Sequence, residues 1–509
     1  MPTCRRTARW TFALVSAGGV VMTLDVTVVN VALSAIVRDL ETGLDRVQWT
    51  VSAYSLTFGA LILTAGALSD RIGRRTVFVA GMALFTLASA GCGLAPDAGT
   101  LIAARAAQGL GGAMVFAPTL ALIAAAYEGD RRRRAIAAFA AIASAAGALG
   151  PVVGGVLVQT LGWRWIFLVN VPIGVLVVVG ALARMPESAA PEVRRRIDPL
   201  GAVLAVGALL ALHYPLVTGP EAGWASPEVL ASAVVGVLLA VALVISQRRA
   251  DGLIDMRLLR IRAFSGAAVL GFLARMSSLG ALAFVTLWLQ STHAYSAMEV
   301  GLHLLPLTGS LLVAGMFTAR LQRVFSPAAL VAGGFAMQGL GMLGLAAAGA
   351  GGGQVATVTG LVLLGVGGAV IFPPLMGVAV GAVPADRAGM ASGLTNACYP
   401  LGTATGVAAF GALFSARIGS ELGPSEQQLR SVAETGRFES VTPALRPLAH
   451  AAFSGGFTAV CLASAAVCLL GVLIARTLKA TVSGAAGRSA APPTSWAHTS
   501  WVRRSSHTK

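Results

Sequence analysis

GVGGAVIFPP (residues 365–374) and GLGGAMVFAP (residues 109–118) are two copies of one ten-residue pattern, identical at six of ten positions. The match continues downstream, because Asp386–Arg387 follows one copy at the spacing at which Asp130–Arg131 follows the other. Two copies in one register indicate a structural unit that the chain uses twice. The simpler alternative is a pair of unrelated packing helices, because small residues let helices approach closely in lipid.

The composition indicates a polytopic membrane protein. The chain has 509 residues, is 56% hydrophobic and only 11% charged, and has a mean hydropathy of +0.79, whereas soluble domains carry about 25% charged residues. A helix of about 20 apolar residues crosses ~30 Å of hydrocarbon. By this criterion we expect fourteen spans, at residues 10–37, 47–69, 76–95, 99–127, 134–160, 163–184, 199–219, 227–247, 264–290, 298–319, 326–348, 354–382, 389–416 and 452–476. The first lacks a cleavage site, so we expect an uncleaved signal anchor.

The two copies of the pattern fall in the fourth and twelfth spans. If the seventh and eighth spans are an insertion, the copies become the fourth helix of two six-helix halves, a plan used by secondary transporters with a substrate site between the halves. We therefore expect an all-α fold with two pseudo-symmetric six-helix bundles plus two extra central helices. The expected parts are an N-terminal tail (1–9), a first bundle (10–184), a linker with the extra helices (185–263), a second bundle (264–477) and a disordered tail (478–509).

A weaker echo supports the duplication. The stretch from Gly66 to Arg71 ends the second span, and the stretch from Gly315 to Arg320 ends the tenth. In this pairing Ala319 stands in the place of Asp70. The two halves would then have the same arrangement of helices but differ in their charged residues.

The arginines predict the orientation. With residues 1–9 inside, most of the 37 Lys and Arg fall in inside loops, as the positive-inside rule requires, and both termini are cytoplasmic. Topology then accounts for the formal net charge of +16, and basic residues scattered over short loops do not indicate nucleic-acid binding. The five cysteines have no metal-like spacing, and no phosphate-binding loop or nucleophile with a partner base is present. We expect no enzymatic activity, metal or cofactor. No glycosylation sequon occurs, which favours a bacterial membrane.

Five motifs follow one another in the first half of the chain: LDVTVVNVAL (24–33), GALSDRIGRR (66–75), LIAARAAQGLGGA (101–113), GALGPVVGG (147–155) and WRWIFLVNVPIG (163–174). They resemble the fourteen-helix drug:proton antiporter branch of the major facilitator superfamily, over residues 10 to about 480. The resemblance implies proton-driven efflux of lipophilic small molecules. Two positions depart from the pattern: Ser34 stands where the first motif usually closes with proline, and Tyr399–Pro400 stands where the thirteenth helix often carries Arg-Gln.

Asp25 and Arg105 are the candidate proton-coupling residues. Asp25 is the one acid well inside a span, and a carboxylate that is costly to keep ionised in hydrocarbon suits proton uptake and release. Arg105 lies mid-span, and a fixed cation would favour the ionised form of a nearby carboxylate. The resemblance implies these same two roles. The alternatives are a structural aspartate bonded to neighbours such as Thr27, and a buried pair that only holds helices together. The second-half position matching Arg105 is Leu361.

The loop after the second span is a candidate cytoplasmic gate, formed by Gly66, Asp70, Arg71, Gly73 and Arg74. A tight loop needs a glycine, and an aspartate there can pair with arginines or face a helix N-terminus. The resemblance implies a contact with the start of the thirteenth helix, near 388–389, that latches the inner side closed. A topological role for the arginines is compatible with this.

In the fifth span, Gly150, Pro151, Gly154 and Gly155 form a candidate kink. Proline removes a helical hydrogen bond and glycines permit close helix crossing. The resemblance associates this motif with exporters, and the alternative is a generic kink.

Arg275, His303 and Tyr399 are candidates for lining a substrate cavity in the second half. Because no acid lies deep in the last six spans, such a cavity suits lipophilic neutral, anionic or singly charged substrates. His303 could instead titrate, or be simply hydrogen-bonded. For Arg275 a structural role is the alternative.

Together these features predict a monomeric, proton-coupled exporter that works in the lipid bilayer of the cytoplasmic membrane. One charge that crosses 100 mV supplies about 2.3 kcal/mol, so an ion gradient is a sufficient driving force. Two other functions stay open: an importer or proton symporter of the same fold, and a membrane receptor or scaffold that transports nothing.

Overall fold

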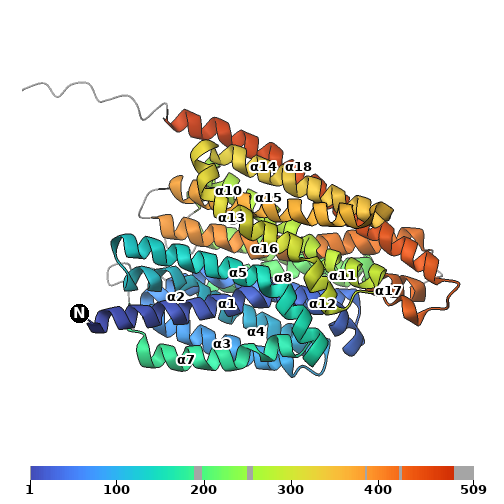
Figure 1. The fold of residues 1–509 in the computed structure, drawn as a ribbon, viewed down its shortest axis with the longest axis horizontal. Helices are drawn as coiled ribbons and strands as arrows, with labels where there is room; N and C mark the ends of the chain where they lie inside the picture. Colours follow the sequence, from blue (N-terminus) through green and yellow to red (C-terminus); the bar gives the residue numbers. More distant parts are fainter. Residues whose placement is uncertain (1, 189–197, 249–255, 384–386, 423–426, 487–509) are drawn as a thin grey trace, which may run out of the picture.

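The computed structural model describes residues 2–188, 198–248, 256–383, 387–422 and 427–486, which are almost wholly helical (Figure 1). The first half contains α1 (Pro2–Asp39), α2 (Leu44–Ile72), α3 (Arg74–Gly93), α4 (Ala98–Ala126), α5 (Gly129–Leu161), α6 (Trp165–Leu168) and α7 (Asn170–Arg184). Two further helices follow, α8 (Pro199–Ala222) and α9 (Pro227–Ser246). The second half contains α10 (Arg262–Arg275), α11 (Ala281–His293), α12 (Ala297–His303), α13 (Leu305–Val324), α14 (Pro327–Ala347), α15 (Gly353–Gly381), α16 (Ala388–Glu421), α17 (Gln427–Thr435) and α18 (Arg446–Ala486).

The fourteen expected spans are confirmed. Among the described residues, thirteen continuous helical stretches are long and apolar enough to cross a membrane, and one of them, Pro327–Gly381, has 55 residues. At 1.5 Å per residue it would extend about 80 Å, more than twice the hydrocarbon thickness. Gly351, with a φ of +102°, breaks this stretch, and α14 and α15 pack side by side as two spans.

Several span ends differ from expectation. α1 begins at Pro2, so the expected N-terminal tail is helical, and α18 continues to Ala486, so the first residues of the expected C-terminal tail are helical too. Residues 487–509 lie outside the described residues. The expected break at Gly162 is confirmed: α5 ends at Leu161, the glycine has a φ of +93°, and α6 begins at Trp165. A φ of this sign is strained for any side chain, which explains a glycine here.

Figure 1 shows two groups of roughly parallel helices, one from each half of the chain. The first contains α1–α5 and α7, and the second contains α10–α18. The extra pair, α8 and α9, packs against itself and, through α8, against α2 and α16. The extra helices therefore lie along the line where the two halves meet.

The repeated pattern occupies the same structural position in both halves. In α4 a Cβ on Gly109 would lie 2.4 Å from the Tyr54 carbonyl oxygen of α2, and in α15 a Cβ on Gly365 would lie 2.1 Å from the Leu307 carbonyl oxygen of α13. One hydrogen bond between helices is repeated as well. The Thr57 hydroxyl donates to the carbonyl of Ala106 (3.0 Å), and the Ser310 hydroxyl donates to that of Val362 (3.1 Å). These equivalent contacts support duplication over chance.

The same equivalence corrects the weaker echo. With Thr57 matched to Ser310, Asp70 falls opposite Arg323, one helical turn beyond the Ala319 of the sequence pairing. Both helices then end in step, α2 at Ile72 and α13 at Val324. The glycine and arginine shared by the two stretches had suggested the other register.

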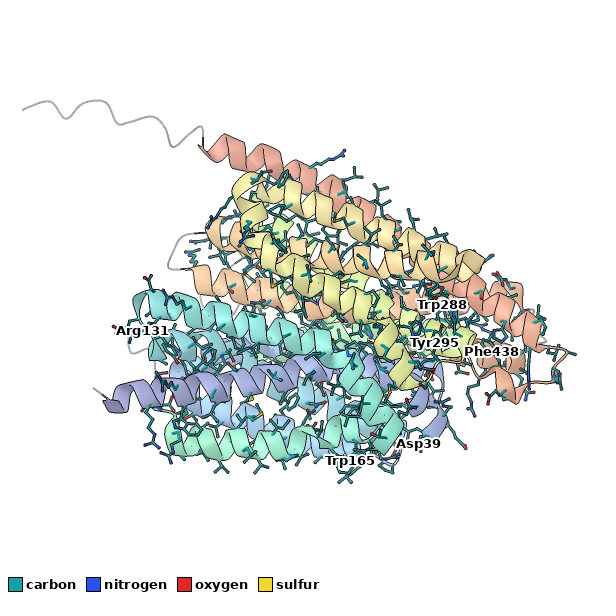
Figure 2. All side chains as sticks on the ribbon, in the orientation of Figure 1. Asp39, Arg131, Trp165, Trp288, Tyr295 and Phe438 are labelled. Carbon is teal, nitrogen blue, oxygen red and sulfur yellow. The ribbon has the colours of Figure 1, made fainter. Side chains whose placement is uncertain are left out.

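The two ends of the molecule differ in how the halves meet. We call the end where α1 and α3 begin the arginine-rich end; it carries Arg131, while Asp39 and Trp165 lie at the opposite end (Figure 2). At the opposite end, one hydrophobic cluster contains residues of both halves, among them Val28, Phe167, Trp288 and Phe410. Towards the arginine-rich end each half has a separate cluster of its own, and one small cluster joins the halves, with Ile62 of α2, Ala113 of α4 and Ala397 of α16.

Direct contacts close the opposite end. The Thr286 hydroxyl and the Gln290 amide of α11 donate to the carbonyls of Asn30 (3.0 Å) and Val31 (2.9 Å) in α1. The halves are also joined by α2 and α16. These two helices pack along much of their length, from Gln48 beside Gly411 to Leu63 beside Gly393.

The outer surface of the bundle is apolar. Large aliphatic side chains point away from the protein on many helices; Leu87 is 72% exposed and Val355 is 80% exposed. Such exposure in a soluble protein would be an aggregation hazard, whereas a bilayer covers it. The protein is a multi-pass membrane protein.

Candidate functional site

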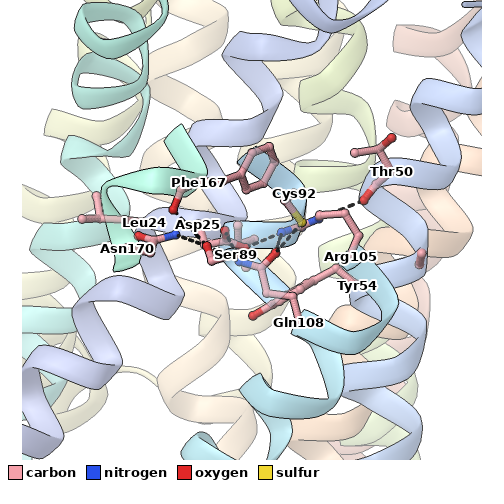
Figure 3. A network of polar contacts seen from close by, with 12 residues as sticks. Leu24, Asp25, Thr50, Tyr54, Ser89, Cys92, Arg105, Gln108, Phe167 and Asn170 are labelled. Atoms are coloured by element: carbon pink, nitrogen blue, oxygen red, sulfur yellow. Dashed lines mark hydrogen bonds and ion pairs between the residues drawn. The ribbon is translucent and has the colours of Figure 1, made fainter. Parts of the chain in front are cut away.

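The first half encloses a buried ion pair between Asp25 of α1 and Arg105 of α4. The Arg105 Nη1 donates to the Asp25 Oδ2 at 2.6 Å, and only 1% of Arg105 and 3% of Asp25 is exposed (Figure 3). The guanidinium also donates through Nε to the Thr50 carbonyl of α2, at 3.1 Å. The structure thus brings together the two residues that the sequence proposed separately. A buried pair of this kind needs such additional bonds, because desolvation of two charges is costly.

Gln108 connects the two charges. Its Oε1 accepts from the Arg105 Nη1 at 2.6 Å, and its Nε2 donates to the Asp25 Oδ1 at 3.0 Å and lies 3.1 Å from the Ser89 hydroxyl. Arg105 and Gln108 are one helical turn apart, so both project to the same side of α4. Every oxygen of the Asp25 carboxylate therefore has a donor.

The network continues into α3 and α7. The Asn170 amide donates to the Ser89 hydroxyl at 3.1 Å, and that hydroxyl donates to the Phe167 carbonyl at 3.0 Å (Figure 3). Ser89, Gln108 and Asn170 are all buried. Five membrane-spanning segments of one half therefore meet at a single polar cluster.

Aromatic rings cover the guanidinium. The Cζ of Arg105 lies 4.4 Å from the ring centroid of Tyr54 and 5.7 Å from that of Phe167. A cation over an aromatic face is stabilised electrostatically, most strongly when it is shielded from water. These rings fix the position of Arg105 between α2 and the α6 turn.

Sequence reasoning did not single out Gln108, Ser89, Asn170 or Tyr54. A signal was present for two of them, because an amide inside an apolar span needs a partner, and both Gln108 and Asn170 lie in spans. Ser89 and Tyr54 gave no such signal, since small polar and aromatic residues are common in these helices.

At the candidate gate, Asp70 pairs with Arg74. The Arg74 Nη2 lies 3.3 Å from the Asp70 Oδ1, one turn away across the α2–α3 junction, and Arg71 is exposed. Gly73 joins the two helices with a φ of +113°, so the expected need for glycine is confirmed. Gly66 lies near Ala117 of α4. The side chains at 388 and 389 lie outside the described residues, so the expected latch stays a prediction.

Glu187, which the sequence did not indicate, binds the N-terminus of α3 at the α2–α3 junction. Its carboxylate accepts from the backbone N–H of Arg75 (3.0 Å), the backbone N–H of Thr76 (3.1 Å) and the Thr76 hydroxyl (2.6 Å), at the N-terminus of α3. Partial burial opposes ionisation, but these hydrogen bonds hold the Glu187 pKa below its ordinary value. The start of the linker is therefore tied to the candidate gate.

The candidate kink is a contact surface with two sides. On one side Gly150 and Gly154 of α5 face Thr27 and Val28 of α1, where a Cβ on Gly150 would lie 1.8 Å from the Thr27 hydroxyl. On the other side the motif packs against α12. A Cβ on Gly155 would lie 2.5 Å from the Ala297 carbonyl oxygen.

α12, the helix that faces this side of α5, is packed equally closely. A Cβ on Gly301 would lie 2.5 Å from the carbonyl oxygen of Pro151, the proline inside α5. The motif therefore allows α5 to pack between α1 of its own half and α12 of the other half.

The candidate cavity residues separate into two places. Arg275 of α10, Tyr399 of α16 and Phe372 of α15 form one cluster, with the Arg275 Cζ 4.2 Å from the Phe372 ring centroid and 5.8 Å from that of Tyr399. His303 is elsewhere, in α12, where its ring stacks on Tyr295 at 4.2 Å and its Nδ1 lies 2.8 Å from the Glu299 carbonyl oxygen. Tyr295 lies at the opposite end (Figure 2).

The chain is similar in sequence to known membrane transporters. A profile of the Major Facilitator Superfamily matches residues 15–407. The chain is 36% identical over 423 residues to the "Multidrug resistance protein Stp" of Mycobacterium tuberculosis, covering 82% of this chain and 78% of that protein. It is 31% identical over 491 residues to the "Tetracenomycin C resistance and export protein" of Streptomyces glaucescens, covering 92% and 91%.

The fold has solved counterparts. A bacterial homolog of the human lysosomal transporter Spinster, solved in an inward-facing and unoccupied conformation, superposes with a TM-score of 0.67 at 15% identity, over 93% of this chain and 98% of that chain. Its likeness concerns the fold alone. By its sequence match and its fold, this chain belongs to the major facilitator superfamily, whose similar members here carry the names of multidrug and antibiotic resistance transporters.

Proposed function

We propose that this protein exports lipophilic small molecules, antibiotics among them, in exchange for protons. The observation that carries the proposal is the buried pair of Asp25 and Arg105, together with the resistance and export names of its relatives. In this proposal no cofactor takes part, and the proton gradient drives the cycle. The arginine-rich end, with both termini, faces the cytoplasm, and the monomer is the working unit.

The ion pair offers a physical link between protonation and movement. When Asp25 takes a proton, it no longer neutralises Arg105, and an uncompensated cation in a dry interior is strongly destabilising. Arg105 is held by Thr50 and Gln108, so the adjustment falls on α1. Protonation therefore favours a different position of α1 relative to α4.

α1 also carries two hydrogen-bonded contacts between the halves. Asn30 and Val31, which accept hydrogen bonds from α11, lie about one and a half turns beyond Asp25, and Thr27 and Val28 face the glycines of α5. A displacement of α1 would loosen the opposite end, where the halves share one hydrophobic cluster. Alternating access then consists of opening this end while the separate clusters at the arginine-rich end approach each other.

The test uses purified protein in liposomes with an imposed pH gradient and a pH-sensitive probe. Lipophilic dyes and antibiotics are added one at a time, with wild type, Asp25→Asn and, as matched control, Asp97→Asn. Asp97 is an exposed acid that caps the N-terminus of α4. Compound-induced proton release in wild type and in the Asp97 variant, but not in the Asp25 variant, supports antiport. Transport that ignores both the gradient and Asp25→Asn contradicts it.

The other two functions predict different results. Inward accumulation driven by the gradient in right-side-out vesicles would favour an importer. A receptor or scaffold would move no compound, and its phenotype would survive Asp25→Asn.

A further inference from the structure

The second half contains a partly buried arginine, Arg275, that forms no ion pair with an acid among the described residues. Arg275 ends α10, just before a π-helical turn, Met276–Gly280. Turns of this kind are rare and occur frequently at functional sites. Here the turn packs against α16, because a Cβ on Gly280 would lie 2.7 Å from Gly406.

The hydrogen-bonding capacity around Arg275 is unused. Its Nε and the Tyr399 hydroxyl are both buried, and neither has a hydrogen-bond partner among the described residues. Phe372 and Tyr399 pack edge to face, with centroids 5.0 Å apart, and form the apolar wall on which the guanidinium rests. The three side chains are only partly buried, so the cluster has an accessible side.

Among the described residues of the helices around Arg275, no carboxylate pairs with this cation; α18, which also packs against α10, contains no acid. Over their described residues, α10, the π-helical turn, α15 and α16 contain one acid, Glu421, at the opposite end of α16. Glu421 pairs with Arg417 at 3.0 Å. The contrast is with Arg105, which has Asp25, Gln108 and the Thr50 carbonyl.

An unpaired charge at this depth calls for an anion from outside the chain. Arginine stays protonated in proteins, and an uncompensated charge that is largely removed from water is destabilising. Arg275 lies at the end of the 14-residue α10, about 20 Å from the start of that helix, and therefore well inside ~30 Å of hydrocarbon. A lipid phosphate at the membrane surface does not reach this depth without leaving its leaflet, whereas a transported molecule does.

We infer that Arg275, Phe372 and Tyr399 form a binding site for the acidic group of a lipophilic substrate, such as a carboxylate or an acidic phenol. The guanidinium provides parallel N–H donors for the two oxygens of a carboxylate, and the Tyr399 hydroxyl provides one more. The aromatic rings contact the apolar part of the same molecule. This inference rests on the proposed function, because it gives the substrate of the exporter an acidic group.

The test measures binding and not transport, so that it can fail independently of proton coupling. The probes are pyrenebutyrate, a fluorescent lipophilic acid, and its uncharged methyl ester. Wild type, Arg275→Met, Arg275→Lys and Tyr399→Phe are reconstituted in nanodiscs of phosphatidylcholine. The matched control is Arg262→Met, because Arg262 is an exposed arginine at the other end of the same helix.

We expect wild type to bind the acid at least tenfold more tightly than the ester. Arg275→Met should abolish this preference and leave ester binding unchanged, which also shows that the variant is folded. Arg275→Lys should keep part of the preference, and Tyr399→Phe should reduce acid binding a few-fold. Equal binding of acid and ester by wild type, or equal weakening of both by Arg275→Met, overturns the inference.

A second arm separates a substrate from a lipid. Wild-type protein in nanodiscs that contain phosphatidylglycerol should bind the acid as tightly as wild-type protein in nanodiscs of neutral lipid. Competition by the anionic lipid that disappears in Arg275→Met would assign the site to a lipid headgroup and overturn the inference. Failure of proton coupling with acid binding intact would contradict the proposed function alone, and coupled export with no acid preference would contradict this inference alone.

Discussion

Arg105 of α4 and Asp25 of α1 pair across 2.6 Å, although 80 positions of the sequence separate them. The pair is buried within one half of the molecule and is held by α2, α3, α4 and α7 through hydrogen bonds. Two helices link the pair to the other half: α1, which carries Asp25, also contacts α11, and α2, whose Thr50 carbonyl accepts from Arg105, packs against α16.

Removal of one charge should cost more than removal of both. Asp25→Asn leaves Arg105 buried without a counter-charge, a change that costs about 3–5 kcal/mol in other buried pairs. The double variant Asp25→Asn with Arg105→Met removes the unpaired cation and should recover much of that loss. Thermal unfolding in detergent measures the stability, and liposome assays measure coupling, which should be absent from both variants. Equal unfolding temperatures for the single and double variants would contradict the pairing.

Gln108 should act through Asp25 and Arg105. Gln108→Leu removes an acceptor from Arg105 and a donor from Asp25, and unpaired buried groups cost about 1–3 kcal/mol. We expect lower stability and a pH profile of proton-coupled export that shifts relative to wild type, because the carboxylate loses a donor. The control is Gln290→Leu, which removes an amide that donates to the Val31 carbonyl of α1, away from the ion pair. A purely structural role would lower stability and leave the pH profile in place.

The closed opposite end should be sensitive to side-chain size at Gly301. Because a Cβ there would lie 2.5 Å from the Pro151 carbonyl oxygen, Gly301→Val should force α12 away from α5, at a cost of about 1–3 kcal/mol. Labelling of an introduced cysteine, Val28→Cys, in a cysteine-free background should rise in rate as this end opens. Gly309→Val, in the same span where a Cβ meets nothing within 4 Å, is the matched control. The prediction is wrong if both valine variants label alike.

The junction of α2 and α3 should weaken in acid. The Glu187 pKa is lowered in the folded protein, so its contribution is fully present above the unfolded value of about 4.5 and is lost as the pH falls through the folded value. Thermal unfolding followed from pH 7 to pH 3 should show a larger loss for wild type than for Glu187→Gln. Because Glu187 is partly exposed, the difference should be small. If the unfolding temperatures of wild type and Glu187→Gln fall in parallel with pH, the ionised Glu187 carboxylate does not stabilise the N-terminus of α3.

The sequence predicted the spans well, because a helix in lipid must satisfy its backbone internally and present apolar side chains for about 20 residues. It failed where packing decides the helix ends and their alignment. α1 extends to Pro2, and the sequence alignment of α13 with α2 was one turn off, because Gly315 and Arg320 repeat the residue types of Gly66 and Arg71 but do not occupy equivalent positions. Likewise His303 was placed with Arg275 only because both are polar residues in the same half.

By itself the sequence determined the fold class, the duplication and the two most important polar residues. It could do so because apolar length, a repeated glycine pattern and an ionisable group within a span are each local features of the chain. Only the tertiary structure decided the partnerships. It set Gln108 between Asp25 and Arg105, left Arg275 without an acid among the described residues, and joined the halves through one large hydrophobic cluster and one small one. These contacts depend on how each helix is rotated about its own axis and where helices cross, and the hydropathy along the chain does not determine either.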